Sequence, residues 1–82
     1  MIQVTLYGKT DCSLCDEALE ILEELAAEYK FRIQKVDITR DEQLYARFHE
    51  VVPVIEVEGT LLFAPIDSRE LRQVVEAALG WM

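Results

Sequence analysis

Both cysteines of this chain lie in one short stretch, Thr10-Asp11-Cys12-Ser13-Leu14-Cys15-Asp16, with two residues between them. The stretch follows an apolar run from Ile2 to Tyr7, in which apolar and polar residues alternate. It leads into a segment whose apolar residues recur at helical spacing as far as Tyr29. These patterns predict a strand, a short turn, and a helix that begins at the cysteines.

This placement predicts reactive cysteines. A cysteine at a helix start meets unpaired N–H groups and the positive end of the helix dipole, and both favour the thiolate. Cys15 follows Cys12 by one turn, close enough to attack a mixed disulfide formed on Cys12. We therefore predict dithiol–disulfide chemistry, with Cys12 as the nucleophile and Cys15 as the resolving thiol.

The rest of the chain alternates between strand and helix patterns. A strand is predicted at 31–38, followed by a helix at 39–50 that opens with the capping-box form of Thr39 to Glu42. Two further strands are predicted at 52–57 and 61–64, with a turn between them at 58–60. A last helix is predicted from Asp67, and it stops at Gly80. The order β-α-β-α-β-β-α predicts an α/β fold in a single domain, residues 1–82, with a four-stranded mixed sheet flanked by three helices. The first two strands form a parallel crossover and the last two an antiparallel hairpin. The cysteines then lie at the carboxyl end of the first strand, the usual ligand edge of such a sheet.

Composition and charge exclude several classes of function. The net charge of −8 disfavours nucleic acid and anionic membranes as partners. No apolar run reaches the roughly 20 residues of a membrane span, and no secretory signal pattern opens the chain. We therefore expect a cytoplasmic monomer.

A disulfide between Cys12 and Cys15 would add little to stability. It closes so short a loop that it would contribute about 2 kcal/mol, against about 4 for a 50-residue loop.

Three segments together resemble a known family. They are the Cys-x-Leu-Cys-Asp-x-Ala pattern of residues 12–18, the Val-Asp-Ile segment at 36–38 and the Val-Pro-Val segment at 52–54. The chain is similar over nearly its whole length to glutaredoxins and other thioredoxin-fold proteins. Within that group it resembles the short bacterial glutaredoxin-like family.

The resemblance implies roles for four further residues. It implies that the Val52–Pro53 bond is cis, that Pro53 packs against the cysteines, and that the Val52 backbone pairs with a bound thiol peptide. Lys9 matches a lysine that glutathione-using relatives carry before their active site, and Asp67 lies near their γ-glutamyl-binding acid. Without the resemblance, the base rates of X–Pro bonds favour an ordinary trans proline at the start of a strand.

Other positions depart from the glutathione-using relatives. Ser13-Leu14 stands between the cysteines where glutaredoxins typically have Pro-Tyr, and Ala64-Pro65 replaces the Gly-Gly that admits the glutathione backbone. With an acidic surface, these changes predict weak use of glutathione as reductant. We expect a protein or small-molecule disulfide as client, a thioredoxin-reductase-type donor as the better reductant, and no bound cofactor.

Two other classes of function fit parts of the sequence. One is a carrier of copper or zinc, since metallochaperones also present two cysteines with this spacing, although in the order β-α-β-β-α-β. The other is a non-catalytic interaction module that keeps the fold without the activity.

The remaining residues are given no role in the chemistry. His49 is interpreted as a surface residue, Tyr7 either flanks the site or packs in the core, and Trp81-Met82 packs on the last helix.

Overall fold

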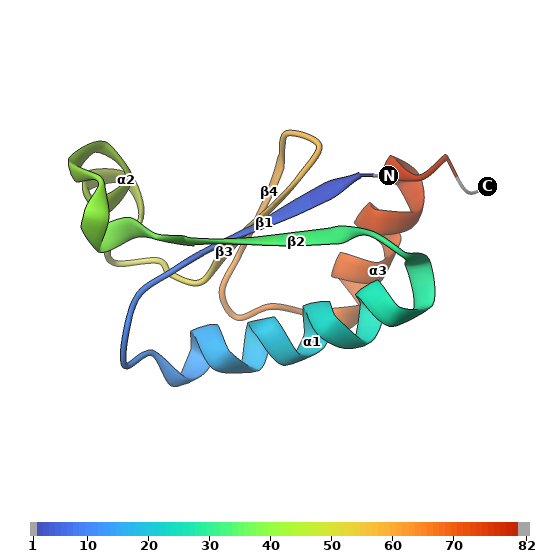
Figure 1. Ribbon diagram of the computed structural model, residues 1–82, viewed down its shortest axis with the longest axis horizontal. Coiled ribbons are helices and arrows are strands. Elements are labelled where there is room, and N and C mark those ends of the chain that lie inside the picture. The colour runs from blue at the N-terminus through green and yellow to red at the C-terminus, as the bar shows by residue number, and fades with distance from the viewer. Residues whose placement is uncertain (1, 81–82) are drawn as a thin grey trace.

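The computed structural model describes residues 2–80, so Trp81 and Met82 lie outside the described residues. Its elements follow in the order β1 (Gln3–Gly8), α1 (Ser13–Tyr29), β2 (Arg32–Asp37), the 3₁₀ helix η1 (Ile38–Arg40), α2 (Glu42–Phe48), β3 (Val54–Val57), β4 (Thr60–Phe63) and α3 (Ser68–Ala78) (Figure 1). The predicted order β-α-β-α-β-β-α is confirmed, with η1 as an addition.

The strands form one mixed sheet in the spatial order β2-β1-β3-β4. β1 pairs with β2 in parallel, with Tyr7 opposite Val36, and pairs with β3 antiparallel, with Leu6 opposite Ile55. β3 and β4 form an antiparallel hairpin whose turn residues, Glu58 and Gly59, have φ angles of 48° and 87°. The predicted crossover and hairpin are therefore both present, and β1 lies inside the sheet with its carboxyl end leading to the cysteines.

One face of the sheet carries the main core. Alternation along β1 buries Val4 and Leu6 on this face, where they pack against α1 and α3. Helix α1 contributes Ala18, Leu22 and Leu25, which recur at helical spacing and are at most 4% exposed. Both helices lie along the same side of the sheet in Figure 1, whereas α2 stands near the end where β2 finishes. A smaller apolar cluster of Ile38, Phe48 and Val54 connects α2 to the sheet.

A side-chain network joins the C-terminal part of α1 to α3. The Tyr29 hydroxyl donates a hydrogen bond to the Glu76 carboxylate at 2.5 Å and accepts one from the Arg72 guanidinium at 2.9 Å. Arg72 also pairs with Glu28 at 2.8 Å. The hydrogen bond to Glu76 is the main reason why the pKa of Tyr29 is raised above its ordinary value. These contacts join α1 to α3.

The start of the second helix differs from the prediction. Thr39 was expected to cap a helix over 39–50, but the helix begins at Glu42 and Asp41 is its N-cap. The Asp41 carboxylate accepts hydrogen bonds from the backbone N–H groups of Gln43 and Leu44 at 2.9 and 3.1 Å. Thr39 instead lies inside η1, where the Asp37 carboxylate accepts hydrogen bonds from its N–H and its hydroxyl, at 2.9 and 2.6 Å.

The hairpin strands also differ from their predicted bounds: β3 begins two residues later, and β4 begins and ends one residue earlier. β3 starts at Val54 because Pro53 has no N–H for the ladder, and because the Val52 N–H donates to the Phe48 carbonyl at 3.0 Å. The Val52–Pro53 bond is cis, as the family resemblance implied. β4 ends at Phe63, and the Ala64–Pro65 bond that follows is also cis, which the sequence did not predict.

Candidate redox site

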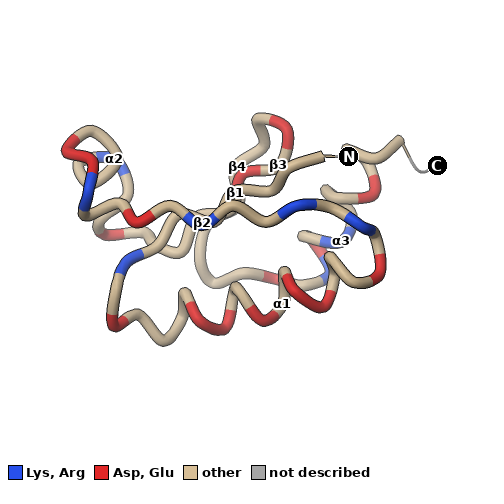
Figure 2. The backbone as a smooth tube through the Cα atoms, in the orientation of Figure 1, with Lys and Arg blue, Asp and Glu red and all other residues tan. Residues whose placement is uncertain are grey.

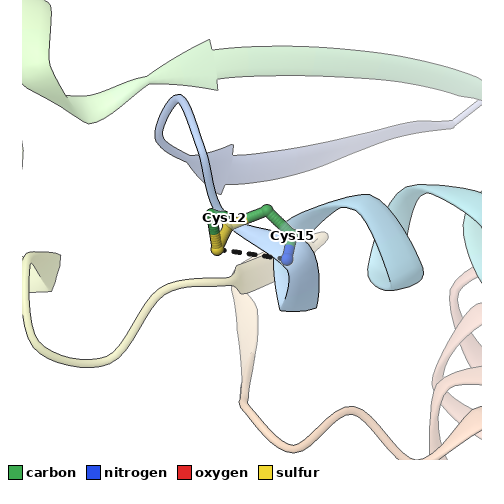
Figure 3. The surroundings of a disulfide bond; sticks show 2 residues. All are labelled: Cys12 and Cys15. Atoms are coloured by element: carbon green, nitrogen blue, oxygen red, sulfur yellow. Dashed lines mark hydrogen bonds between the residues drawn. A yellow bond between two sulfur atoms is a disulfide. The ribbon is translucent and has the colours of Figure 1, made fainter.

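Cys12 and Cys15 form a disulfide at the start of α1, with their Cα atoms 5.2 Å apart (Figure 3). Asp11, just before them, has a φ of 58°, in the left-handed region that aspartate tolerates better than most residues. Cys12 is the N-cap of α1, and its Sγ accepts a hydrogen bond from the Cys15 N–H at 3.2 Å. This N–H is one of the donors that a helix start leaves without a partner inside the helix, so the helix itself supplies a hydrogen bond to the Cys12 sulfur.

The two sulfurs differ in exposure. Cys15 is 7% exposed and belongs to the buried side of α1, whereas Cys12 is half-buried at the edge of the helix. Gly8, the last residue of β1, lies directly against Cys15: a Cβ at this position would be 3.2 Å from the Cys15 Sγ. Sequence reasoning missed Gly8 as a site residue, although a glycine ending the strand that leads to the cysteines was an available signal.

A cavity of about 450 Å³ opens on one side of Cys15. Three of the chain's eight basic residues line it, Lys9, Lys35 and Arg40, together with two acids, Asp16 and Asp37. Hydrogen bonds from the Thr39 hydroxyl and N–H hold the pKa of Asp37 below its ordinary value, so this acid stays ionised beside the cations. The other lining residues are Leu6, Gly8, Thr10, Cys15, Leu19 and Val36. Lys9, predicted from the sequence, is thus near the cysteines, while Lys35 and Arg40 were not predicted.

A groove of about 140 Å³ runs beside the start of α1, and it is lined by Leu14, Glu17, Ala18, Ile21, Pro53, Ala64, Pro65 and Ile66. Pro53 is fully buried in its wall, and Leu14, two residues after Cys12, is 53% exposed at its edge. The groove therefore combines the predicted Pro53 with the Ala64-Pro65 pair. Because the Val52 N–H is already donated to Phe48, the carbonyl is the backbone group that Val52 can offer without breaking that bond.

Asp67 lines neither the cavity nor the groove. It is the N-cap of α3, and its carboxylate accepts hydrogen bonds from the N–H groups of Arg69 and Glu70 at 2.8 and 3.4 Å. The Asp-led cap predicted for the last helix is therefore present. The residue just before it, Ile66, is the one through which this segment reaches the groove.

Tyr7 and His49 line neither the cavity nor the groove. The Tyr7 ring packs against Phe48, with ring centres 5.0 Å apart, and its hydroxyl donates to the Glu56 carboxylate at 3.0 Å. Burial, reinforced by Glu56, raises the pKa of Tyr7 above its ordinary value. His49 is exposed and stacks on Tyr45, as expected for a surface residue. The core alternative for Tyr7 is thus the one observed.

The fold also differs from the one expected for a small metal carrier, which has the order β-α-β-β-α-β instead of the order observed. Within residues 2–80, no three His, Cys, Asp or Glu side chains come together in a group that could hold a metal ion. None of the helices in this part of the chain is long and apolar enough to cross a membrane.

The mixed sheet, the flanking helices and the disulfide-bonded cysteine pair after the carboxyl end of β1 define a thioredoxin-fold protein. Comparison of sequences then gives the family. The chain belongs to the family described as Glutaredoxin-like domain (DUF836), whose model matches residues 3–76.

Solved structures agree with this assignment. A structural genomics target protein from X. campestris is 35% identical, with a TM-score of 0.78 over 90% of this chain and 96% of that one. A point mutant of thioredoxin from Halobacterium salinarum shares 19% identity, with a TM-score of 0.72 over 94% of this chain and 74% of its own. A structure described as a malarial protein shares 18% identity, with a TM-score of 0.71 over 96% of this chain and 98% of its own. At such low identity, the last two show the fold alone.

Proposed function

We propose that this protein is a thiol–disulfide oxidoreductase that reduces disulfides through Cys12 and Cys15 as part of cell redox homeostasis. One observation carries the proposal: a half-buried sulfur at the N-cap of α1 and a buried sulfur one turn later are bonded to each other. A site that serves exchange needs one sulfur that a client can reach and a second held where it can displace that client.

The reaction starts from the reduced pair. The Cys12 thiolate, stabilised by the Cys15 N–H, attacks one sulfur of the client disulfide. A bond forms between Cys12 and that sulfur, and the other client sulfur leaves as a thiolate. Cys15 then loses its proton and attacks Cys12, which releases the second client thiolate and forms the Cys12–Cys15 disulfide. The client gains two electrons, and the protein loses two.

A dithiol or two monothiols must return those electrons before the next cycle. Three features support a thioredoxin-reductase-type donor over glutathione. Ala64-Pro65 occupies the approach that Gly-Gly leaves open in the relatives, the Val52 N–H is already paired with Phe48, and the net charge of −8 repels the glutathione anion. We further propose that the protein works in the cytoplasm as a monomer, with Lys9 beside the site and the Val52 carbonyl accepting a hydrogen bond from the client backbone.

Trapping separates this proposal from a purely binding role. The variant Cys15→Ser keeps the nucleophile but cannot resolve the intermediate, so it should accumulate a mixed disulfide between Cys12 and a model disulfide substrate. Cys12→Ser should form none. Mass spectrometry of the non-reduced proteins measures both. If Cys12→Ser retains client capture at the wild-type level and the wild type reduces no disulfide, the protein is an interaction module and the proposal is wrong.

A reductase panel identifies the electron donor. Oxidised protein is supplied either with thioredoxin reductase and NADPH, or with glutathione, glutathione reductase and NADPH, and NADPH consumption is followed. We expect the first system to regenerate the dithiol faster. Robust turnover with glutathione that collapses on Lys9→Ala would show that Ala64-Pro65 does not impede glutathione.

A further inference from the structure

The groove beside the start of α1 has a mixed chemical character that the proposed redox step does not require. Its walls are apolar apart from one carboxylate, that of Glu17. Its volume of about 140 Å³ is close to that of an apolar protein cavity which takes up one benzene molecule, so it has room for one aliphatic or aromatic side chain. Pro53, which also lines the groove, is fully buried.

One face of α1 forms the long wall of the groove. The residues that line it stand at positions i, i+3, i+4 and i+7 and therefore share one side of the helix: Leu14, Glu17, Ala18 and Ile21. Leu14 is 53% exposed. An apolar surface that begins two residues from Cys12 would gain from contact with an apolar side chain next to the client cysteine.

The same helix carries a run of exposed acids along its length, visible as the red bands on α1 in Figure 2. Within the described part of the chain, the ion pair formed by this helix is that between Glu28 and Arg72, which leaves the Glu17 carboxylate free to attract an external cation. Glu20 and Glu24 continue from Glu17 along the helix and are also exposed. Lys9, Lys35 and Arg40 line the cavity next to Cys15 and not the groove.

From this arrangement we infer that the groove selects its client: an extended polypeptide whose disulfide cysteine is flanked by an apolar side chain, which enters the groove, and by a basic side chain, which pairs with Glu17. The inference rests on the proposed function, because the groove matters only if Cys12 attacks a client disulfide. It deepens that function by naming the class of client, which is a protein segment with an apolar and a basic side chain beside its disulfide cysteine. Glutathione meets neither requirement, since it is a net anion and has no large apolar side chain.

The test uses synthetic peptides with one cysteine joined by a disulfide to the neutral thiol 2-mercaptoethanol. The first carries leucine on both sides of the cysteine and lysine outside each leucine. The second replaces both lysines by glutamate, and the third replaces both leucines by serine. Fully reduced protein is mixed with each peptide in a single turnover, which needs no further reductant, and the released peptide thiol is measured after acid quenching. Each rate is divided by the rate with dithiothreitol, which removes the intrinsic reactivity of the peptide.

For the wild type, we expect the lysine–leucine peptide to react about two- to fivefold faster than its glutamate counterpart, in line with the strength of exposed ion pairs. The advantage should shrink in high salt, because salt screens exposed charges. The leucine peptide should exceed the serine peptide at least about fourfold, the effect of burying one methylene group. Equal normalised rates for the three peptides would overturn the inference and leave the proposed function standing. Failure to reduce any of them, or bis(2-hydroxyethyl) disulfide, would refute both.

Two variants distinguish the groove from the overall charge of the protein. Glu17→Lys and Glu23→Lys make the same change in charge at exposed positions of α1, but Glu23 does not line the groove. Glu17→Lys should abolish or reverse the preference for the lysine peptide, whereas Glu23→Lys should retain most of it and leave the reduction of bis(2-hydroxyethyl) disulfide unchanged. Equal shifts in both variants would show that net charge alone sets the preference, and the inference would then be wrong.

Discussion

The contact between Gly8 and Cys15 makes the substitution Gly8→Ala a sharp test of how the buried sulfur is held. An alanine Cβ at position 8 would stand 3.2 Å from the Cys15 Sγ and 3.4 Å from its Cβ. The first distance is shorter than comfortable van der Waals contact, and Cys15 is 7% exposed and fixed on α1, so it has little room to retreat. Overpacking of this kind costs about 1–3 kcal/mol.

An opposing effect comes from the unfolded state. Gly8 does not have a positive φ, so alanine can adopt its backbone conformation. Replacing glycine by alanine at such a position stabilises a protein by about 0.4–1 kcal/mol, because the unfolded chain loses freedom. The overpacking cost is the larger of the two, and we expect a net loss of about 1 kcal/mol, or about 4–8 °C in melting temperature for a domain of this size.

A double-mutant cycle isolates the contact. In the background Cys15→Ala the sulfur is gone and the remaining contact is ordinary, so Gly8→Ala should become neutral or stabilising by about 0.4–1 kcal/mol. Urea unfolding followed by circular dichroism, in a reducing buffer for all four proteins, measures the free energy of unfolding. The same loss on Gly8→Ala in both backgrounds would refute the reasoning, because the cost would then not arise at the sulfur.

Three further predictions follow from the local geometry. In the reduced protein, Cys12 should react with iodoacetamide at least about tenfold faster than Cys15, because Cys12 is more exposed and its sulfur accepts a hydrogen bond from a helix N–H. Peptide mapping after a short pulse at mildly acidic pH measures the two rates. Equal labelling of the two cysteines would contradict the assigned roles. The lowered pKa of Asp37 means that its ionised form is stabilised by folding, so this stabilisation is present above the ordinary Asp pKa of about 3.9 and is lost as the pH falls through the lowered value. Asp37→Asn should therefore lower the urea midpoint at pH 7, with the gap to the wild type closing in strong acid; a gap independent of pH would show that the charge is not involved. Asp67→Ala removes the cap of α3 and should lower the free energy of unfolding by about 0.5–2 kcal/mol, whereas Asp67→Asn, which keeps a capping oxygen, should lower it less. Thermal unfolding compares the two variants. Equal losses of stability would mean that the capping oxygen does not stabilise α3.

The features that the sequence alone predicted are those decided by local chemistry. Alternation from Ile2 to Tyr7 and helical spacing from Leu14 to Tyr29 both appear in the structure because each element buries one face against the same core. Cys12 lies at a helix start because its neighbours end one pattern and begin another. The cap at Asp67 was equally predictable, since its carboxylate binds N–H groups two and three residues ahead.

Local signals failed where two of them competed for the same residues. The sequence predicted Thr39 as the cap, but Asp37 binds Thr39 within η1, and the helix begins after Asp41 instead. In the same way, the strand expected from Val52 begins two residues later because the Val52 N–H is already bound to Phe48. Nothing in the spacing of the apolar residues distinguishes these outcomes.

The two hollows beside the cysteines were decided only by the tertiary structure. The cavity is lined by Lys9, which follows β1, by Lys35 of β2 and by Arg40 of η1, while the groove lies between α1, Pro53 and the segment before α3. Their chemical character depends on which side chains of distant segments share a space, and that follows from strand order and helix packing. Sequence spacing therefore predicts the pair of sulfurs, but the surroundings that would select a client arise only when the sheet and its helices are assembled.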